Sequence, residues 1–424
     1  MSIKKVFLFY FLSFSVVVFS QENIIINLKV EGAKKTKRSF VCKLLETKKG
    51  LVLDSLSLER DMILLKRLPA ISHASYRVTH YQDNYYKVSI NLEENLTLLP
   101  SVNLWTTTNK QFSYKLGLYD YNFLGKNITF GGFYQNNGFN SYGVNLKAPN
   151  LLLSNLGLAV SHQNWKSEEP LYFDDKSANY LYNNISFEVL ALYQINLKNQ
   201  LNFGVNIFNE KYQYLSGHTS TSIPQNLDLD KTLFKLVYTF DNLDYYYQYI
   251  QGFKSTLYLQ YVTSNNSFQS DFFIAWNDFF YYRKMWKKGT WANRLRFGLS
   301  TNEKTPFAPF ALDNNVNLRG VGILVDRGTG VALWNTEYRY IVYDKKWLAI
   351  QTNVFSDFGS WRNPGNTFND FFKSENLRIY SGVGLRFISK KIYNATFRID
   401  YGFRISNNPN QSKGGLVFGI GQYF

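Results

Sequence analysis

Apolar and polar residues alternate along short segments from about residue 100 to the end of the chain. In the clearest segment, almost every second residue from Leu377 to Phe387 is apolar, and Arg378 and Arg386 lie between them. The next segment repeats the pattern, with Arg398, Asp400 and Arg404 as its polar members. A period of two is the signature of β-strands with two unlike faces. The pattern predicts sixteen strands between residues 101 and 424.

The charged positions indicate which face of these strands faces lipid and which faces a wet interior. An arginine on a lipid-facing strand costs about 2–4 kcal/mol at mid-bilayer, so arginines at every second position indicate a wet, charge-paired interior. A tilted spanning strand needs about 9–11 residues, and sixteen of them with connections fit residues 98–424. A soluble sheet can alternate too, but the pattern recurs throughout this region. We therefore predict a 16-stranded antiparallel transmembrane β-barrel, with 167–182 and 216–230 as outward loops.

Two other segments precede the predicted barrel. Residues 1–20 carry Lys4 and Lys5, a short apolar run and Ser20, the pattern of a secretory signal peptide. Residues 21–97 predict a small α+β domain of order β-α-α-β-β, in which Asp54 or Ser55 caps the second helix. Beyond the leader no apolar run is long enough for a membrane-spanning helix. Export without such helices favours a bacterial outer membrane.

One stretch of the barrel combines a long loop with two strongly polar strand faces. The loop carries Asn317-Leu318-Arg319-Gly320-Val321, the next strand has Glu337 and Arg339 on one face, and the strand after it ends in Phe355-Ser356-Asp357-Phe358-Gly359. Alternation places Asp357 on the same polar face as Gln351 and Asn353. We predict that Arg319 folds into the lumen and meets Asp357.

Composition narrows the range of functions. The 18% aromatic content suits strands and interfacial girdles, and the formal net charge of +16 fits a cationic lumen near anionic lipid or an acidic client. No nucleic-acid-binding motif accompanies this charge. The single cysteine, Cys42, and four scattered histidines form no metal motif, and no catalytic motif is present. We expect no enzyme activity, cofactor, metal or nucleic-acid partner.

These residues resemble the outer-membrane assembly and translocation superfamily of BamA and TamA. The β-α-α-β-β module is similar to a POTRA domain, Asn317–Val321 to the inward-folded sixth-loop motif, and Phe355–Gly359 to the motif of the thirteenth strand. Asp120-Tyr121-Asn122-Phe123-Leu124-Gly125 resembles the segment after the second strand. The resemblance implies that Arg319, Gly320, Asp357 and Gly359 hold the loop in place, with Glu337 and Arg339 extending the lumen network. A terminal aromatic such as Phe424 on the last strand is typical of outer-membrane barrels, where it acts as an assembly signal.

The implied function is insertion or translocation of polypeptides at the outer membrane, with the POTRA-like domain in the periplasm. The expected partners are outer-membrane lipid, polypeptide clients and periplasmic or accessory proteins. A weak seam between the first and last strands would template the incoming strand. Val321 stands where the family usually has an aromatic residue. The chain has one POTRA-like module where relatives have several, which favours a smaller, accessory member of the superfamily. The alternative is a channel or lipid-export pore on the same fold.

Overall fold

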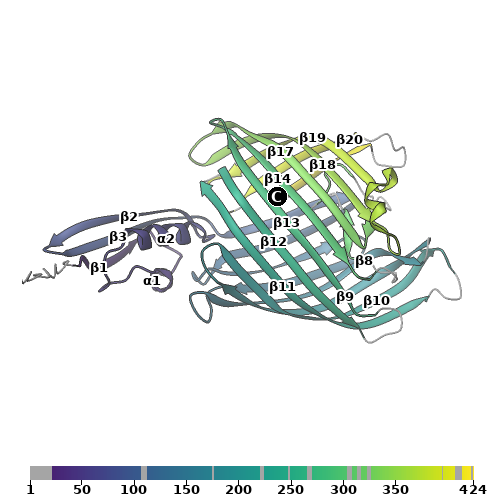
Figure 1. The fold of residues 1–424 in the computed structure, drawn as a ribbon, viewed down its shortest axis with the longest axis horizontal. Helices are drawn as coiled ribbons and strands as arrows, with labels where there is room; N and C mark the ends of the chain where they lie inside the picture. Colours follow the sequence, from purple (N-terminus) through teal and green to yellow (C-terminus); the bar gives the residue numbers. More distant parts are fainter. Residues whose placement is uncertain are drawn as a thin grey trace, which may run out of the picture.

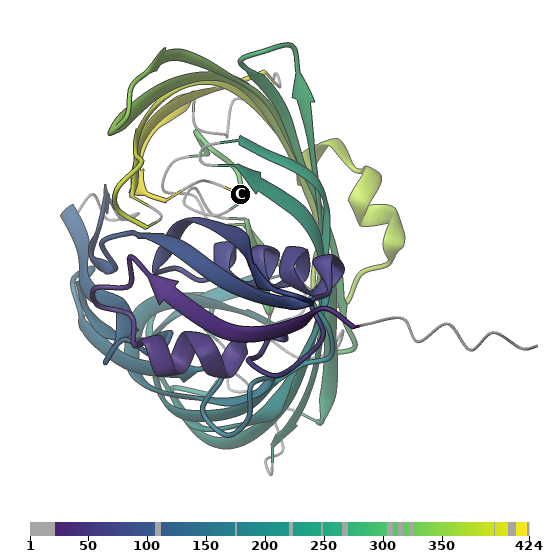
Figure 2. The same ribbon diagram turned by 90° about the vertical axis from the view of Figure 1, so that its left-hand side faces the viewer.

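The computed structural model describes residues 22–106, 112–173, 176–219, 224–246, 249–264, 270–302, 308–312, 317–321, 326–393, 395–405, 413–421 and 424. A small α+β unit stands at one end of a large barrel of tilted strands (Figure 1). Viewed along the barrel, this unit lies across part of the opening (Figure 2). The predicted signal peptide lies outside the described residues.

The small unit packs two helices against a three-stranded sheet. Its elements are β1 (Ile24–Glu31), α1 (Arg38–Leu44), α2 (Ser55–Lys66), β2 (Ile71–Gln82) and β3 (Tyr85–Glu94). The sheet order is β1-β3-β2, with β1 parallel and β2 antiparallel to the central β3. Asp54 caps α2, because its carboxylate accepts hydrogen bonds from two amide N–H groups of the first turn. A core of buried aliphatic side chains joins the layers, including Ile25, Val41, Leu65 and Ile90.

The small unit is fastened to the barrel where its first connection meets the turn between the second and third barrel strands. The Lys35 ammonium lies 2.9 Å from the Asp120 carboxylate, and the Asn122 amide donates to the Thr36 hydroxyl. Gly125, at φ +69°, approaches so closely that a Cβ there would lie 2.3 Å from the Lys35 carbonyl oxygen. The segment from Asp120 to Gly125 therefore forms a domain junction. On the other side, the Arg67 guanidinium donates to the main-chain oxygens of Leu197 and Asp241.

Glu94 orders the connection between β1 and α1. Its carboxylate accepts hydrogen bonds from the amides of Lys34, Lys35 and Thr36 at 3.1, 2.9 and 2.8 Å. Partial burial disfavours the charged form, but these donors outweigh it and hold the pKa of the Glu94 carboxyl below its ordinary value. The carboxylate is thus the form that orders the junction.

A pH-dependent loosening of the junction follows. Because the folded pKa is depressed, the stabilisation is fully present above the unfolded value of about 4.3 and is lost as the pH falls through the folded pKa. Hydrogen exchange at residues 34–36, corrected for intrinsic pH effects, is expected to accelerate on acidification. Glu94→Gln should exchange fast already at neutral pH and show no further acid response. An acid response of equal size in Glu94→Gln would contradict the assignment to this carboxyl.

Within the described ranges, sixteen antiparallel strands form the barrel, each paired with its neighbour in sequence apart from the short hairpin inserted after β14. This number confirms the predicted strand count. The strands are β4 (Leu98–Thr106), β5 (Phe112–Phe123), β6 (Ile128–Asn136), β7 (Asn140–Ala148), β8 (Leu156–Phe173), β9 (Lys176–Gln194), β10 (Asn199–Gly217), β11 (Asn226–Tyr246), β12 (Tyr249–Ser264), β13 (Phe272–Met285), β14 (Gly289–Ser300), β17 (Gly330–Asp344), β18 (Leu348–Arg362), β19 (Leu377–Ser389), β20 (Thr396–Arg404) and β21 (Gly414–Ile420).

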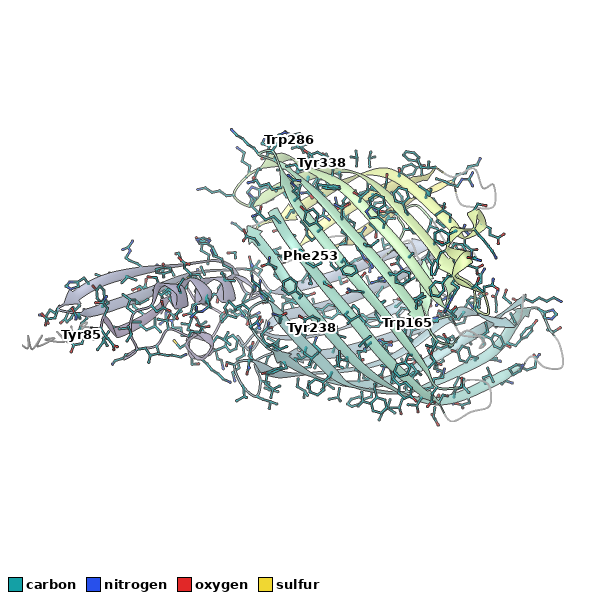
Figure 3. The ribbon with its side chains drawn as sticks, in the orientation of Figure 1. Tyr85, Trp165, Tyr238, Phe253, Trp286 and Tyr338 are labelled. Carbon is teal, nitrogen blue, oxygen red and sulfur yellow. The ribbon has the colours of Figure 1, made fainter. Side chains whose placement is uncertain are left out.

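The two faces of the wall differ as alternation requires. On β17, Glu337 and Arg339 are buried inside, whereas Trp334 and Tyr340 on the alternate positions are 45% and 42% exposed on the outside. Aromatic side chains are spread over the outer wall, where Trp286 and Tyr338 lie near one end (Figure 3). Such a surface suits a bilayer, because aromatic girdles and an apolar band face lipid in spanning barrels.

The predicted outward loops are wrong in one region. Residues 167–182 are almost wholly strand, because β8 continues to Phe173 and β9 starts at Lys176. Residues 216–217 and 226–230 likewise belong to β10 and β11, so the second predicted loop is wrong at its two ends. These strands run well past the membrane-spanning length because their far ends have an apolar cluster of their own. The cluster contains Leu171, Ala178, Tyr180, Tyr212, Leu227 and Leu229.

The last strand is shorter than predicted. β21 ends at Ile420, and Gly421 has a left-handed φ of +102°, a conformation that side-chain-bearing residues rarely adopt. Phe424 lies off the strand, inside the barrel, against a cluster that includes Leu243 and Tyr282. Its main-chain oxygen accepts a hydrogen bond from Arg339 at 2.8 Å. The structure thus places Phe424 in the lumen, and its role as an assembly signal stays a prediction.

Candidate functional site: a charged network beneath an inward loop

The long loop between β14 and β17 enters the barrel. Its stem is a short hairpin of β15 (Phe310–Leu312) and β16 (Asp326–Gly328). Beyond the stem, residues 317–321 lie inside the lumen with Leu318, Arg319 and Val321 almost completely buried. The loop tip is therefore an internal part of the barrel.

Arg319 meets Asp357 at the loop tip. Its Nε and Nη2 atoms donate to the two carboxylate oxygens at 2.9 and 2.8 Å, and its own amide N–H donates to Oδ2 at 2.9 Å. The guanidinium also stacks over the Phe355 ring, with 3.7 Å from Cζ to the ring centroid. A two-pronged pairing of this kind fixes orientation as well as position. Both side chains have no exposed surface.

Glu337 is the centre of a larger network. Its carboxylate lies 2.5 Å from Nη1 of Arg319 and 3.1 Å from Nη2 of Arg386, and it also accepts from Arg339. Asp400 adds a further carboxylate, 3.2 Å from Arg398. Charges removed from water are tolerated when they are paired and hydrogen-bonded. We call Arg319, Glu337, Arg339, Asp357, Arg386, Arg398 and Asp400 the lumen network.

Two glycines allow the loop tip to lie so close to the wall. Gly320 has φ +93°, and a Cβ there would lie 2.6 Å from the main chain of Gly402 on β20. A Cβ on Gly359 would lie 2.8 Å from Leu318 and 3.0 Å from Leu312. Gly320 lets the loop tip contact the main chain of β20, and Gly359 lets β18 contact the loop side chains. A larger residue at either position would push the loop tip away from the wall.

An apolar cluster surrounds the loop next to the lumen network. Four loop residues take part, Phe310, Leu312, Leu318 and Val321. They pack against inward side chains from β10 round to β19, so the loop fills this part of the lumen. We call this set the apolar plug, and its wall members are Phe208, Leu233, Val262, Phe272, Ile274, Trp276, Val331, Leu333, Trp361 and Tyr380.

Ion pairs clamp the stem of the loop between two walls. The Asp326 carboxylate lies 2.9 Å from the Arg378 guanidinium on β19. The next residue, Arg327, pairs with Glu169 on the extended part of β8. The stem is thereby tied to strands on different sides of the barrel.

The structure brings together most of the residues predicted for the site, namely Arg319, Gly320, Asp357 and Gly359 with Glu337 and Arg339. Sequence reasoning placed Arg386, Arg398 and Asp400 on an inward face but did not connect them with the loop. Phe355 was missed, although it alternates with Asp357 and so shares its inward face. The apolar plug was also missed, because no period marks a loop that packs inside a barrel.

In the described part of the chain, the first and last strands of the barrel lie side by side without a hydrogen-bonded ladder between them. Across the described residues no ladder joins β21 to β4, which are the two ends of the sheet. Just before β4, the chain is fastened, because the Leu96 amide donates to Lys391 and the Tyr393 amide donates to Leu96. We call the unjoined length between β4 and β21 the seam.

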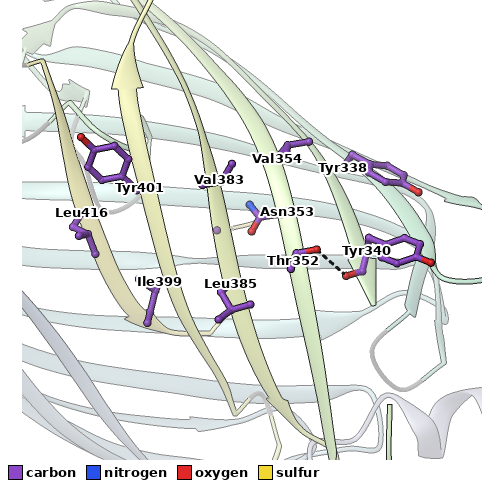
Figure 4. Close-up of a pocket in the computed structure, with 11 residues that line it drawn as sticks. Tyr338, Tyr340, Thr352, Asn353, Val354, Val383, Leu385, Ile399, Tyr401 and Leu416 are labelled. Atoms are coloured by element: carbon purple, nitrogen blue, oxygen red, sulfur yellow. Dashed lines mark hydrogen bonds between the residues drawn. The ribbon is translucent and has the colours of Figure 1, made fainter. Parts of the chain in front are cut away.

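Beside the seam, the outer wall carries an apolar groove of about 680 Å³. Aliphatic and aromatic side chains from β17 to β21 line it, among them Tyr340, Val383 and Leu416 (Figure 4). The main chain of Gly384 lies in its floor, and a Cβ on this residue would point to the lumen side, towards Asp400 and Asn353. The wall is thus hollowed on its outer side next to the seam.

The network offers charge pairing between buried side chains. The described ranges contain no group of three His, Cys, Asp or Glu side chains placed to hold a metal ion. In the same ranges, the helices are all too short or too polar to cross a bilayer.

Comparison with known proteins identifies the fold. No protein-family model matches the sequence, and no curated protein is significantly similar to it. Among solved structures, BamA from Haemophilus ducreyi lacking POTRA domains 1–3 is similar over 94% of this chain and 84% of that chain, with 13% identity and a TM-score of 0.58. CdiB from Escherichia coli is similar over 94% and 76%, with 11% identity and a TM-score of 0.63. CdiB from Acinetobacter baumannii is similar over 95% and 74%, with 11% identity and a TM-score of 0.60. The chain therefore has a BamA-type fold.

Proposed function

We propose that this protein is a non-enzymatic outer-membrane factor that inserts polypeptides into the outer membrane or passes them across it. The observation that carries the proposal is the seam. Within the residues that the structure describes, β4 and β21 meet without a ladder, and a strand edge without a ladder partner can template an incoming strand through backbone hydrogen bonds. The fold shared with BamA and CdiB supports the same conclusion.

The small unit would act as a POTRA-like receiving domain in the periplasm. It stands at the end of the barrel where the strands are joined by short turns, and the outer edges of its sheet are β1 and β2. An extended client segment could pair with such an edge before it reaches the seam.

The lumen supports insertion at the seam more than passage through an open pore. The apolar plug and the lumen network occupy the side of the barrel from β10 round to β20. A channel or lipid-export pore would be wider with the loop displaced, whereas strand templating at the seam leaves the loop in place.

Site-specific photocrosslinking tests the proposal. A photoreactive amino acid at Leu104 on β4 or Leu416 on β21 is expected to form adducts with nascent outer-membrane proteins. The matched control is Phe234 on β11, which is equally outward-facing at 53% exposure but lies far from the seam. Seam positions free of adducts while client assembly proceeds at its normal rate, or adducts equally frequent at Phe234, would contradict the proposal.

A further inference from the structure

The connection between β18 and β19 lies on the outside of the barrel. It contains two short 3-10 helices, η1 (Phe368–Phe372) and η2 (Ser374–Asn376), which stand outside the wall in Figure 2. The Phe371 ring lies 6.0 Å from the outward-facing Phe297 ring on β14. A hydrogen bond of 2.9 Å from the Ser360 hydroxyl to the Phe371 oxygen holds it there. The connection is therefore folded back on the lipid-facing side of the wall.

A buried carboxylate fixes the shape of this connection. Asp370 is 1% exposed, and it accepts from the Asn363 amide at 3.0 Å and from the Asn366 side chain at 2.9 Å. Lys373 pairs with it at 2.7 Å. With its backbone held in this way, the connection presents Phe368 and Phe372 outward at 54% and 88% exposure. Two large aromatic side chains are thus displayed by an ordered segment.

The position of the connection along the wall matches a membrane boundary. Trp347 and Tyr343 are exposed at the end of the wall near the small unit, and Trp334 stacks on Phe358 towards the other end. Nine residues separate Tyr343 from Trp334 (343 − 334), which at about 3.3 Å per residue and a tilt of about 40° span roughly 23 Å along the barrel axis. The apolar band of such barrels is about 25 Å tall. Phe297 pairs with Ala332, two residues beyond Trp334, so Phe371 lies close to the outer boundary.

We propose that Phe368, Phe371 and Phe372 form an aromatic foot that enters the interfacial region of the outer leaflet. The occupant of this apolar surface is lipid, because the foot is continuous with the exposed aromatic belt of the wall through Phe371 and Phe297. Aromatic side chains favour the boundary between acyl chains and headgroups. The inference rests on the membrane placement proposed above, and it adds a second contact with the leaflet that lies outside the strands.

Fluorescence quenching in vesicles tests the foot and its premise separately. In a Cys42→Ser background, Phe372→Cys is labelled with an environment-sensitive fluorophore and the full chain is reconstituted in phosphatidylcholine vesicles. The lipids carry a nitroxide either near the headgroup or near the chain end. Val354→Cys, on the outward face of β18, is the wall control, and Tyr85→Cys, at the tip of the small unit (Figure 3), is the water control.

The foot predicts strong quenching at position 372 by the shallow nitroxide, weaker quenching by the deep one, and none at position 85. Quenching at position 354 but not at 372 would overturn the foot and leave the membrane placement intact. This result combined with shielding of 372 from a water-soluble thiol reagent in cells would assign the surface to a protein partner instead. A lack of quenching at 354 would refute the membrane placement itself.

Discussion

Replacing Arg319 with alanine is expected to free the loop tip and destabilise the barrel strongly. The change leaves Asp357 and Glu337 buried without their shared cation, and breaking a buried pair costs about 3–5 kcal/mol. Asp357→Ala is expected to have a similar effect, since it removes the acceptor of three hydrogen bonds. Loss of the compact, fast-migrating form on unheated gels as temperature or denaturant rises measures the effect.

The double variant, with alanine at both Arg319 and Asp357, tests whether the two residues stabilise the barrel as one unit or independently. If Arg319 and Asp357 act together, the double variant should lose little more than the worse single variant. Fully additive losses would argue against the pairing as the basis of loop docking. Arg283→Ala is the matched control, because this arginine is exposed on β13 and should change stability by less than about 0.5 kcal/mol.

The second large effect is expected at the apolar plug. Leu318 has no exposed surface and packs against Gly359 and Leu312, so Leu318→Asp would place a carboxylate among apolar side chains. Such a burial costs several kcal/mol, and undocking of the loop relieves it. Single-molecule conductance in planar bilayers is therefore expected to rise in the variant.

Leu318→Met is the control for this experiment, since a volume-conserving apolar change usually costs less than about 1.5 kcal/mol. Its conductance should match that of the unchanged protein. Equal conductance in Leu318→Asp and Leu318→Met would mean that the loop does not control passage through the lumen.

Alternation along the strands predicted the architecture well, because a physical constraint acts on every second residue. Arg386, Arg398 and Asp400 cannot face lipid, and their spacing gave the inward face correctly. The same argument placed Asp357 and Glu337 on inward faces. Strand limits outside the membrane were lost because the lipid constraint ends there. Beyond that point β8 and β9 are held by an apolar cluster around Tyr180.

Long-range contacts were the other limit. The pairing of Arg319 with Asp357 could be predicted because alternation gave the inward face of Asp357, and the resemblance implied the same pairing. The link from Glu337 to Arg386 joins strands that are not neighbours, and no local pattern encodes it. Phe424 shows the same limit, because its alternation with Phe418 and Ile420 predicts a strand, whereas β21 ends at Ile420 and Phe424 lies in the lumen.

Strand length varies sharply around the barrel, from 7 residues in β21 and 9 in β4 to 21 in β11. The tall strands β8 to β11 lie roughly across from the short pair. The mouth of the barrel is consequently slanted, because the wall extends further at β8 to β11 than at β4 and β21. A segment that emerges beside the short strands β4 and β21 meets the aqueous exterior early. The longer strands β8 to β11 shield one side of it from neighbouring molecules.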